Sequence, residues 1–184
     1  FSQIRNRVLR ENVEDLKSEI MAANAEFISS EDVDWPVSCQ DLSAPPIGLV
    51  IKGDRKLLAQ LGNSISIVGS RRPTNYGLNV ANKLATDASK QQIVVISGGA
   101  YGIDTAAHKA AIIAGGRTIS VLAGGVNCLY PLENRELFSE ITKAGLLISE
   151  VMPSVKTMPA RFLNRNRLIA ALSKATVVVE AEFV

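Results

Sequence analysis

The residues best suited to chemistry are an arginine and several small polar residues in two loops that directly follow apolar runs. After residues 65–68 an arginine offers a planar fork of N–H donors, which suits phosphate oxygens. After residues 93–96 a glycine-rich loop lets a ligand approach backbone amides closely. Alternatively, these glycines serve only as turn residues and the arginine is solvated. The candidate ligand-binding residues of the two loops are Gly69, Ser70, Arg71, Ser97, Gly98 and Gly99.

A third basic feature lies nearer the C-terminal end. If a helix begins near Asn164, Arg165 and Arg167 lie in its first turn, where positive charge opposes the helix dipole. A bound anion would relieve that cost. Alternatively, one arginine pairs with an acidic neighbour such as Glu150 or Glu180, and each interpretation can hold for a different arginine.

Side chains able to do acid–base chemistry are few. His108 is the only histidine, and in the alanine-rich stretch 106–111 a packed, hydrogen-bonded role is favoured over catalysis. Asp104 is expected to orient loop amides or to cap the following helix rather than to act as a base. Three tyrosines beside the loops could stack on bases, with at least one serving only for packing: Tyr76, Tyr101 and Tyr130.

These loops require a framework in which strands and helices alternate. Short β-branched runs indicate strands at 65–68, 93–96, 118–122, 146–148 and 176–179. Segments with helical periodicity separate them at 76–90, 105–114, 133–143 and 164–172. This alternation predicts an α/β fold with a mostly parallel sheet flanked by helices. In such sheets ligands bind beyond the carboxyl ends of the strands, which is where both loops lie.

The N-terminal part has a different character. Residues 2–25 are predicted to form a helix with a packing stripe, followed by a turn-rich linker at 29–46. Residues 49–51 indicate a further strand that could lie at a sheet edge, and Asp54 is the expected cap of a short helix at 55–61. The expected divisions are residues 1–46, a partial helical segment with its linker, and residues 47–184, an α/β domain. Both ends are expected to be incomplete. The stripe comprises Ile4, Val8, Leu9, Val13, Leu16 and Ile20.

Composition narrows the class of protein. A chain of 184 residues with 47% hydrophobic and 5% aromatic residues suits one α/β domain around a buried parallel sheet. Neither a membrane-spanning run nor a signal peptide is apparent in the sequence. Cys39 and Cys128 match no metal or redox spacing, which favours reduced thiols and a cytoplasmic location. A net charge of +2 allows nucleic-acid binding only if arginines gather on one face.

Several of these segments, in the same order, resemble the DNA-processing protein A (DprA/Smf) family. The similarity extends over about residues 34–181. Several motifs in register are more specific than any single glycine pattern. The matching motifs are IVGSR at 67–71 with Tyr76-Gly77, SGGAYGID at 97–104 with Ala107-His108, Tyr130-Pro131 with Asn134, Ser149-Glu150, RNRLI at 165–169 and VEA at 179–181.

The resemblance implies that residues 47–184 form an extended Rossmann-like domain that binds single-stranded DNA and no dinucleotide. Members of the family are non-enzymatic homodimers without cofactor or metal, and they help to load the RecA recombinase during natural transformation. Binding through phosphates carries no strong sequence preference. The implied DNA-binding residues are Gly69, Ser70, Arg71, Ser97, Gly98, Gly99, Arg165, Asn166 and Arg167, with Arg135 the nearest candidate for a basic residue beside the Tyr-Pro-x-x-Asn segment.

Two classes of enzyme are the alternatives. A nucleoside-monophosphate phosphoribohydrolase of the lysine-decarboxylase-like type shares the core and a glycine-rich phosphate loop. Such enzymes carry the pattern Pro-Gly-Gly-x-Gly-Thr followed by a catalytic glutamate. In this chain Ser97 stands in place of the proline, and the glutamate has no counterpart. A dinucleotide-dependent oxidoreductase needs Gly-x-Gly-x-x-Gly after the first strand, where Arg71 stands instead. The sequence therefore favours a binding protein.

Overall fold

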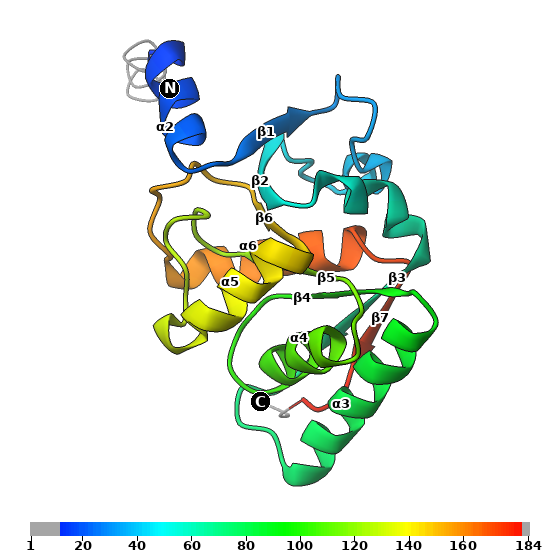
Figure 1. Ribbon diagram of the computed structural model, residues 1–184. Coiled ribbons are helices and arrows are strands. Elements are labelled where there is room, and N and C mark those ends of the chain that lie inside the picture. The colour runs from blue at the N-terminus through cyan, green and yellow to red at the C-terminus, as the bar shows by residue number, and fades with distance from the viewer. Residues whose placement is uncertain (1–11, 182–184) are drawn as a thin grey trace.

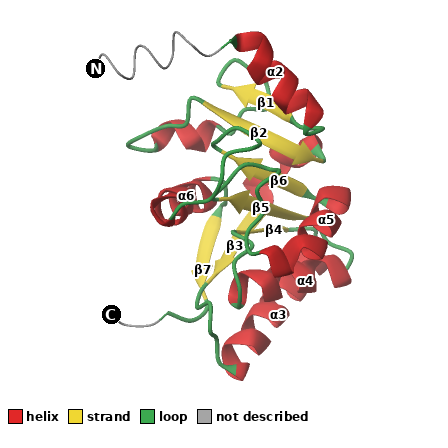
Figure 2. Ribbon diagram, turned by 90° about the vertical axis from the view of Figure 1, so that its left-hand side faces the viewer, coloured by secondary structure: helices red, strands yellow, loops and turns green. Residues whose placement is uncertain are grey.

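A seven-stranded sheet forms the centre of the computed structural model, which describes residues 12–181. The strand order is β1-β2-β6-β5-β4-β3-β7 (Figures 1 and 2). The strands from β6 to β7 run parallel, whereas β1 and β2 are antiparallel to their neighbours. The predicted α/β fold with a mostly parallel sheet is therefore confirmed. The strands are β1 Glu26–Ser29, β2 Gly48–Gly53, β3 Ser64–Val68, β4 Val94–Ser97, β5 Thr118–Leu122, β6 Leu146–Ser149 and β7 Ala175–Val178.

Helices cover both faces of this sheet. Figure 2 shows α6 on one face and α3, α4 and α5 on the other. Because successive strand residues point to opposite faces, Ile96 of β4 packs with Leu168 of α6, while Val95 packs with alanines of α3 and α4. The helices are α2 Val13–Ala22, α3 Asn75–Lys90, α4 Ile103–Ile113, α5 Arg135–Ala144 and α6 Pro159–Ala171, with 3-10 helices η1 Val37–Asp41, η2 Arg55–Asn63 and η3 Leu132–Asn134.

Strand β1 was not anticipated from the sequence. Strand β1 pairs with β2, so β2 lies inside the sheet. The suggestion that the strand at residues 49–51 lies at a sheet edge is therefore wrong. Only Ile28 is buried in this four-residue strand, which is too short for a visible alternation of apolar and polar residues. The boundary after residue 46 stays a prediction, although β1 comes from the segment before it.

The N-terminal helix is present in part. Helix α2 lies within the predicted span 2–25 and fully buries none of its residues. Of the expected packing stripe, Val13 is exposed, whereas Leu16 and Ile20 are half-buried. Ile4, Val8 and Leu9 of that stripe lie outside the described residues. Within residues 12–181, no helix combines the length and the apolar character needed to cross a membrane.

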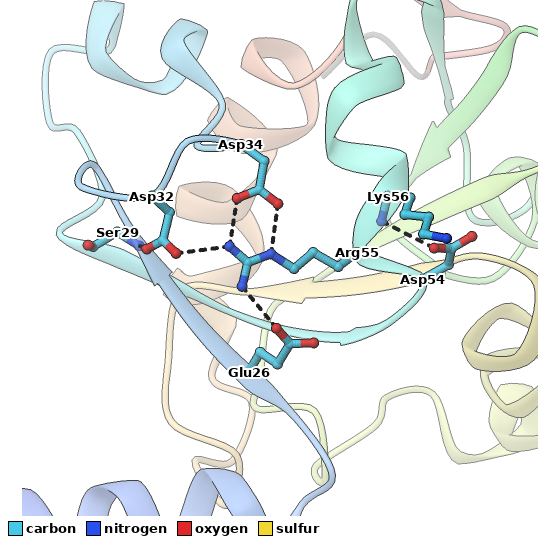
Figure 3. Close-up of polar contacts among 7 residues, drawn as sticks. All are labelled: Glu26, Ser29, Asp32, Asp34, Asp54, Arg55 and Lys56. Atoms are coloured by element: carbon cyan, nitrogen blue, oxygen red, sulfur yellow. Dashed lines mark hydrogen bonds and ion pairs between the residues drawn. The ribbon is translucent and has the colours of Figure 1, made fainter.

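Arg55 fastens the turn-rich segment that follows β1 to the rest of the domain (Figure 3). Its guanidinium donates two hydrogen bonds to Asp34 at 2.7 Å, one to Asp32 at 2.9 Å and one to Glu26 of β1 at 2.9 Å. Arg55 opens η2, and the side chain of Asp54 caps that helix by accepting the N–H of Lys56 at 3.1 Å, as predicted.

Helix α6 begins earlier than predicted. Its first residue is Pro159 rather than Asn164, because proline has no N–H to lose and its φ is already helical at a first position. Arg165 and Arg167 therefore lie in the body of the helix and not in its first turn. The predicted conflict between these arginines and the helix dipole is wrong for this reason.

Candidate functional site

A cavity of about 680 Å³ opens beyond the carboxyl ends of β3, β4 and β7. Strand β3 lies between the other two, so the loops that follow these strands converge at one edge of the sheet. Five predicted site residues line this cavity: Gly69, Ser70, Arg71, Arg165 and Asn166. Further lining residues that sequence reasoning did not propose as binding residues include Arg72, Ala100, Asp104 and Glu180.

The other five predicted residues do not line the cavity: Ser97, Gly98, Gly99, Arg135 and Arg167. The side chain of Ser97 is fully buried, and its hydroxyl donates a hydrogen bond to the carbonyl of Ile67 at 2.7 Å, which ties β4 to β3. Arg135 is the exposed first residue of α5. A DNA contact by any of the five stays a prediction.

Arg71 is the basic residue best placed to meet a ligand. Its side chain is exposed, and the guanidinium carbon lies 5.2 Å from the centre of the Phe162 ring. Phe162 in turn meets Tyr130 edge-on, with ring centres 5.5 Å apart. Among residues 12–181, Arg71 takes part in no ion pair. The aromatic ring thus orients the guanidinium while its N–H donors remain free for an anion.

Phe162 was missed as a site residue. The arginines of the segment 161–167 mark it as a candidate site, but a helix predicted to begin at Asn164 leaves Phe162 in the preceding loop. Pro159 is the local feature that could have corrected this, since proline favours the first helical position.

Arg165 has a different environment from Arg71, although both line the cavity. Its side chain is 6% exposed, and Nη1 donates to the carbonyl of Gly98 at 2.7 Å and to that of Val121. Burial lowers the pKa of Arg165, nearby Asp104 opposes that shift and Arg71 adds to it. A Cβ at position 98 would overlap this guanidinium, so a larger residue there would displace Arg165 from its acceptors. Arg165 is thus committed to holding the second loop.

Asp104 holds the same loop from the other side. Its carboxylate accepts the N–H groups of Gly98 at 3.1 Å and of Ala100 at 3.3 Å, as predicted for a residue that orients loop amides. The side-chain amide of Asn134 donates to the carbonyl of Gly99 at 3.0 Å. Burial raises the pKa of Asp104, and Arg165 and the amides oppose that rise. Hydrogen bonds with Asp104, Asn134 and Arg165 therefore hold the loop in place without a ligand, and such preorganisation reduces the ordering cost of binding.

The structure distinguishes between the two interpretations of Arg165 and Arg167, anion binding and pairing with an acidic neighbour. Arg167 pairs with Glu150 at 2.5 Å, so the ion-pair alternative is confirmed for this residue. Glu180, the other suggested partner, instead accepts hydrogen bonds from Thr74.

His108 is fully buried, and its Nδ1 lies 2.7 Å from the hydroxyl of Thr118. Burial lowers the pKa of His108 to about 3, and Arg165 contributes to that shift. The imidazole is therefore neutral and out of reach of a ligand, which confirms the prediction of a packed helix residue.

Tyr101 donates to the carboxylate of Glu133, and this bond raises the pKa of Tyr101 to about 12.

Comparison with known proteins agrees with this architecture. Residues 26–183 match the family model described as DNA recombination-mediator protein A. DNA processing protein DprA of Bacillus subtilis is 41% identical over 148 residues, which cover 80% of this chain and 50% of that protein. The chain spans about half the length of the curated relatives it matches.

Two solved structures share the fold closely. DNA processing protein A (DprA) from Streptococcus pneumoniae superimposes with a TM-score of 0.87 and 31% identity, covering 97% of this chain and 62% of that one. DNA processing protein A from Helicobacter pylori gives a TM-score of 0.78 and 32% identity over 88% and 72%. The H. pylori structure concerns that protein's single-stranded DNA binding mode. Since the family match includes both loops, the cavity and α6, the chain belongs to the DNA recombination-mediator protein A family.

Proposed function

We propose that this protein binds single-stranded DNA in the cavity at the carboxyl ends of β3, β4 and β7, without strong sequence preference. The observation that carries the proposal is Arg71, which is exposed at the cavity, oriented by Phe162 and outside every ion pair of residues 12–181. Arg72 lines the same cavity. Phosphate contacts of this kind fix the position of a strand but do not distinguish bases.

The protein acts by binding rather than by catalysis. The only histidine is buried and neutral, and Asp104 is occupied by the amides of its own loop. We further propose that the protein takes part in DNA uptake and recombination as a homodimer that promotes the loading of RecA on single strands, and membership of the family supports this proposal. Light scattering at several concentrations tests the dimer. ATP hydrolysis by RecA on a single strand covered with single-strand-binding protein tests the loading.

Fluorescence anisotropy of a labelled oligothymidine tests the DNA site directly. The Arg71→Ala variant is expected to bind roughly tenfold to a hundredfold more weakly, since hydrogen bonds to charged groups contribute about 1.5–3 kcal/mol. Arg117→Ala is the matched control, because Arg117 precedes β5 at the amino ends of the parallel strands. Equal loss in both variants, or no binding by the folded wild-type protein, would refute the proposal.

A further inference from the structure

The N-terminus of α3 is filled from within the protein. Helix N-termini carry free N–H groups and partial positive charge, and dinucleotide-binding folds use the helix after a strand at this place to hold a pyrophosphate. Here the N–H of Thr74 donates to both carboxylate oxygens of Glu180 at 3.1 Å, and the Thr74 hydroxyl donates to one of them at 3.0 Å. A carboxylate of the chain thus lies at the N-cap of α3, beside the helix end that holds a phosphate in dinucleotide-binding folds.

Gly77 provides the space for this carboxylate. It lies buried in the first turn of α3, and a Cβ built there would overlap an oxygen of Glu180. The main chain of Glu180 is held as well, because its carbonyl accepts the N–H of Ser70 at 2.7 Å. The main chain of Glu180 is therefore bonded to the loop that carries Arg71, and its side chain is bonded to Thr74.

Glu180 also lines the cavity that contains Arg71 and Arg72. Its negative charge disfavours phosphate on the α3 side and leaves the arginine side as the path for phosphates. If a nucleoside diphosphate bound as in a dinucleotide-binding fold, its pyrophosphate, the most highly charged group of the nucleotide, would lie against the carboxylate of Glu180. A nucleic-acid strand carries one charge per phosphodiester and can follow Arg71 without approaching α3.

We propose that Glu180 is the specificity-determining residue of this cavity, because it occupies the phosphate position of α3 and so excludes nucleotides in favour of a nucleic-acid strand. The preference for the strand depends on the proposed function. The exclusion of nucleotides does not, and it can be tested separately.

The test compares the binding of ADP, measured by calorimetry, with that of oligothymidine, measured by anisotropy. Glu180→Ala vacates the position, and Glu180→Gln removes the charge while keeping the size and an oxygen that can accept from Thr74. Glu140→Gln, an exposed residue of α5, controls for net charge. ADP affinity is expected to rise about tenfold or more in Glu180→Ala, and less in Glu180→Gln, with no rise in the control. Oligothymidine affinity stays equal or increases.

Unchanged ADP affinity in folded Glu180 variants overturns the proposal, as does a wild-type protein that binds ADP as tightly as they do. Thermal melting shows which variants fold, and Glu180→Gln carries the test if Glu180→Ala does not. If the wild-type protein fails to bind oligothymidine while the ADP result holds, the proposed DNA function fails and the role of Glu180 in excluding nucleotides stands.

Discussion

At the scale of single residues, two arginines at one cavity have different tasks. Arg71 is exposed over Phe162, whereas Arg165 is buried and bonded to the carbonyls of Gly98 and Val121. Removing a solvated arginine leaves nothing unsatisfied. Removing a buried one leaves carbonyls without donors and the nearby Asp104 without compensation.

Arg165→Met is therefore expected to lower the free energy of unfolding by about 3 kcal/mol. Arg71→Ala is expected to change it by less than about 0.5 kcal/mol, as for most surface substitutions. Urea unfolding followed by circular dichroism measures both. If Arg165→Met were as stable as the wild-type protein, its role in holding the second loop would be wrong.

His108 makes stability depend on pH in a defined window. Burial lowers its pKa from the ordinary 6.5 to about 3, so below pH 6.5 the unfolded chain takes up a proton that the folded protein does not. The contribution of His108 to the free energy of unfolding is therefore fully present above pH 6.5. It decreases as the pH falls, by roughly 1.4 kcal/mol per pH unit near pH 5. His108→Gln should remove this slope, because the chain has no other histidine. Equal slopes from pH 6 to pH 5 in both proteins would contradict the assignment.

At the scale of elements, the cluster around Arg55 joins β1 and the segment after it to η2 (Figure 3). Its members come from three places in the chain. The cluster lies at the β1 edge of the sheet, which is the edge opposite β7. The hydrogen bonds to Arg55 lower the pKa of Asp34. The pKa of Asp32 is lowered first by the N–H of Ser29 and then by Arg55.

Arg55→Ala is expected to lower the melting temperature by about 3–6 °C at neutral pH. Because the pKa values of Asp32 and Asp34 are depressed in the folded protein, the cluster contributes above the ordinary carboxyl pKa of 3.8. Its contribution is lost as pH falls through the lower folded values. The difference from wild type, followed by scanning calorimetry, should be constant near pH 7 and shrink below about pH 4. Oligothymidine binding should not change, and a weakened affinity would mean that this end of the sheet reaches the cavity.

Element boundaries also limited what could be predicted about the site. The strands and helices around both loops were expected at nearly their observed positions, because apolar β-branched runs and helical periodicity are local properties. The start of α6 was predicted at Asn164 instead of Pro159, and for that reason Phe162 was not predicted as a site residue. Strand β1 was missed because four residues with one buried side chain carry too little pattern.

At the scale of the whole molecule, the proposed DNA binding depends on where the charges lie and not on the net charge. The formal charge is only +2, yet Arg71, Arg72 and Arg165 all line one cavity. Parallel pairing of β3 with β4 and β7 brings the loops that follow these strands, including the one with Arg71 and Arg72, to the same edge, and Arg165 comes from α6.

Oligothymidine affinity should consequently fall with salt, by a slope of about −0.7 in log K against log salt for each phosphate neutralised. Arg71→Ala should reduce the size of that slope by about 0.7. Anisotropy titrations over a series of sodium chloride concentrations measure it. A flat response of the wild-type protein would rule out a phosphate-binding cavity.

The sequence by itself determined the alternation of strands and helices, the two ligand-side loops and the family resemblance, because each depends on residues close together in the chain. The tertiary structure decided which side chains of those loops face the cavity. The Ser97 hydroxyl turns inward to the carbonyl of Ile67, and Arg165 of α6, although it lines the cavity, donates to the carbonyls of Gly98 and Val121. Glu180 reaches Thr74 across 106 positions of sequence. Burial and pairing of this kind depend on residues that only the folded chain brings together, so no local pattern could have specified them.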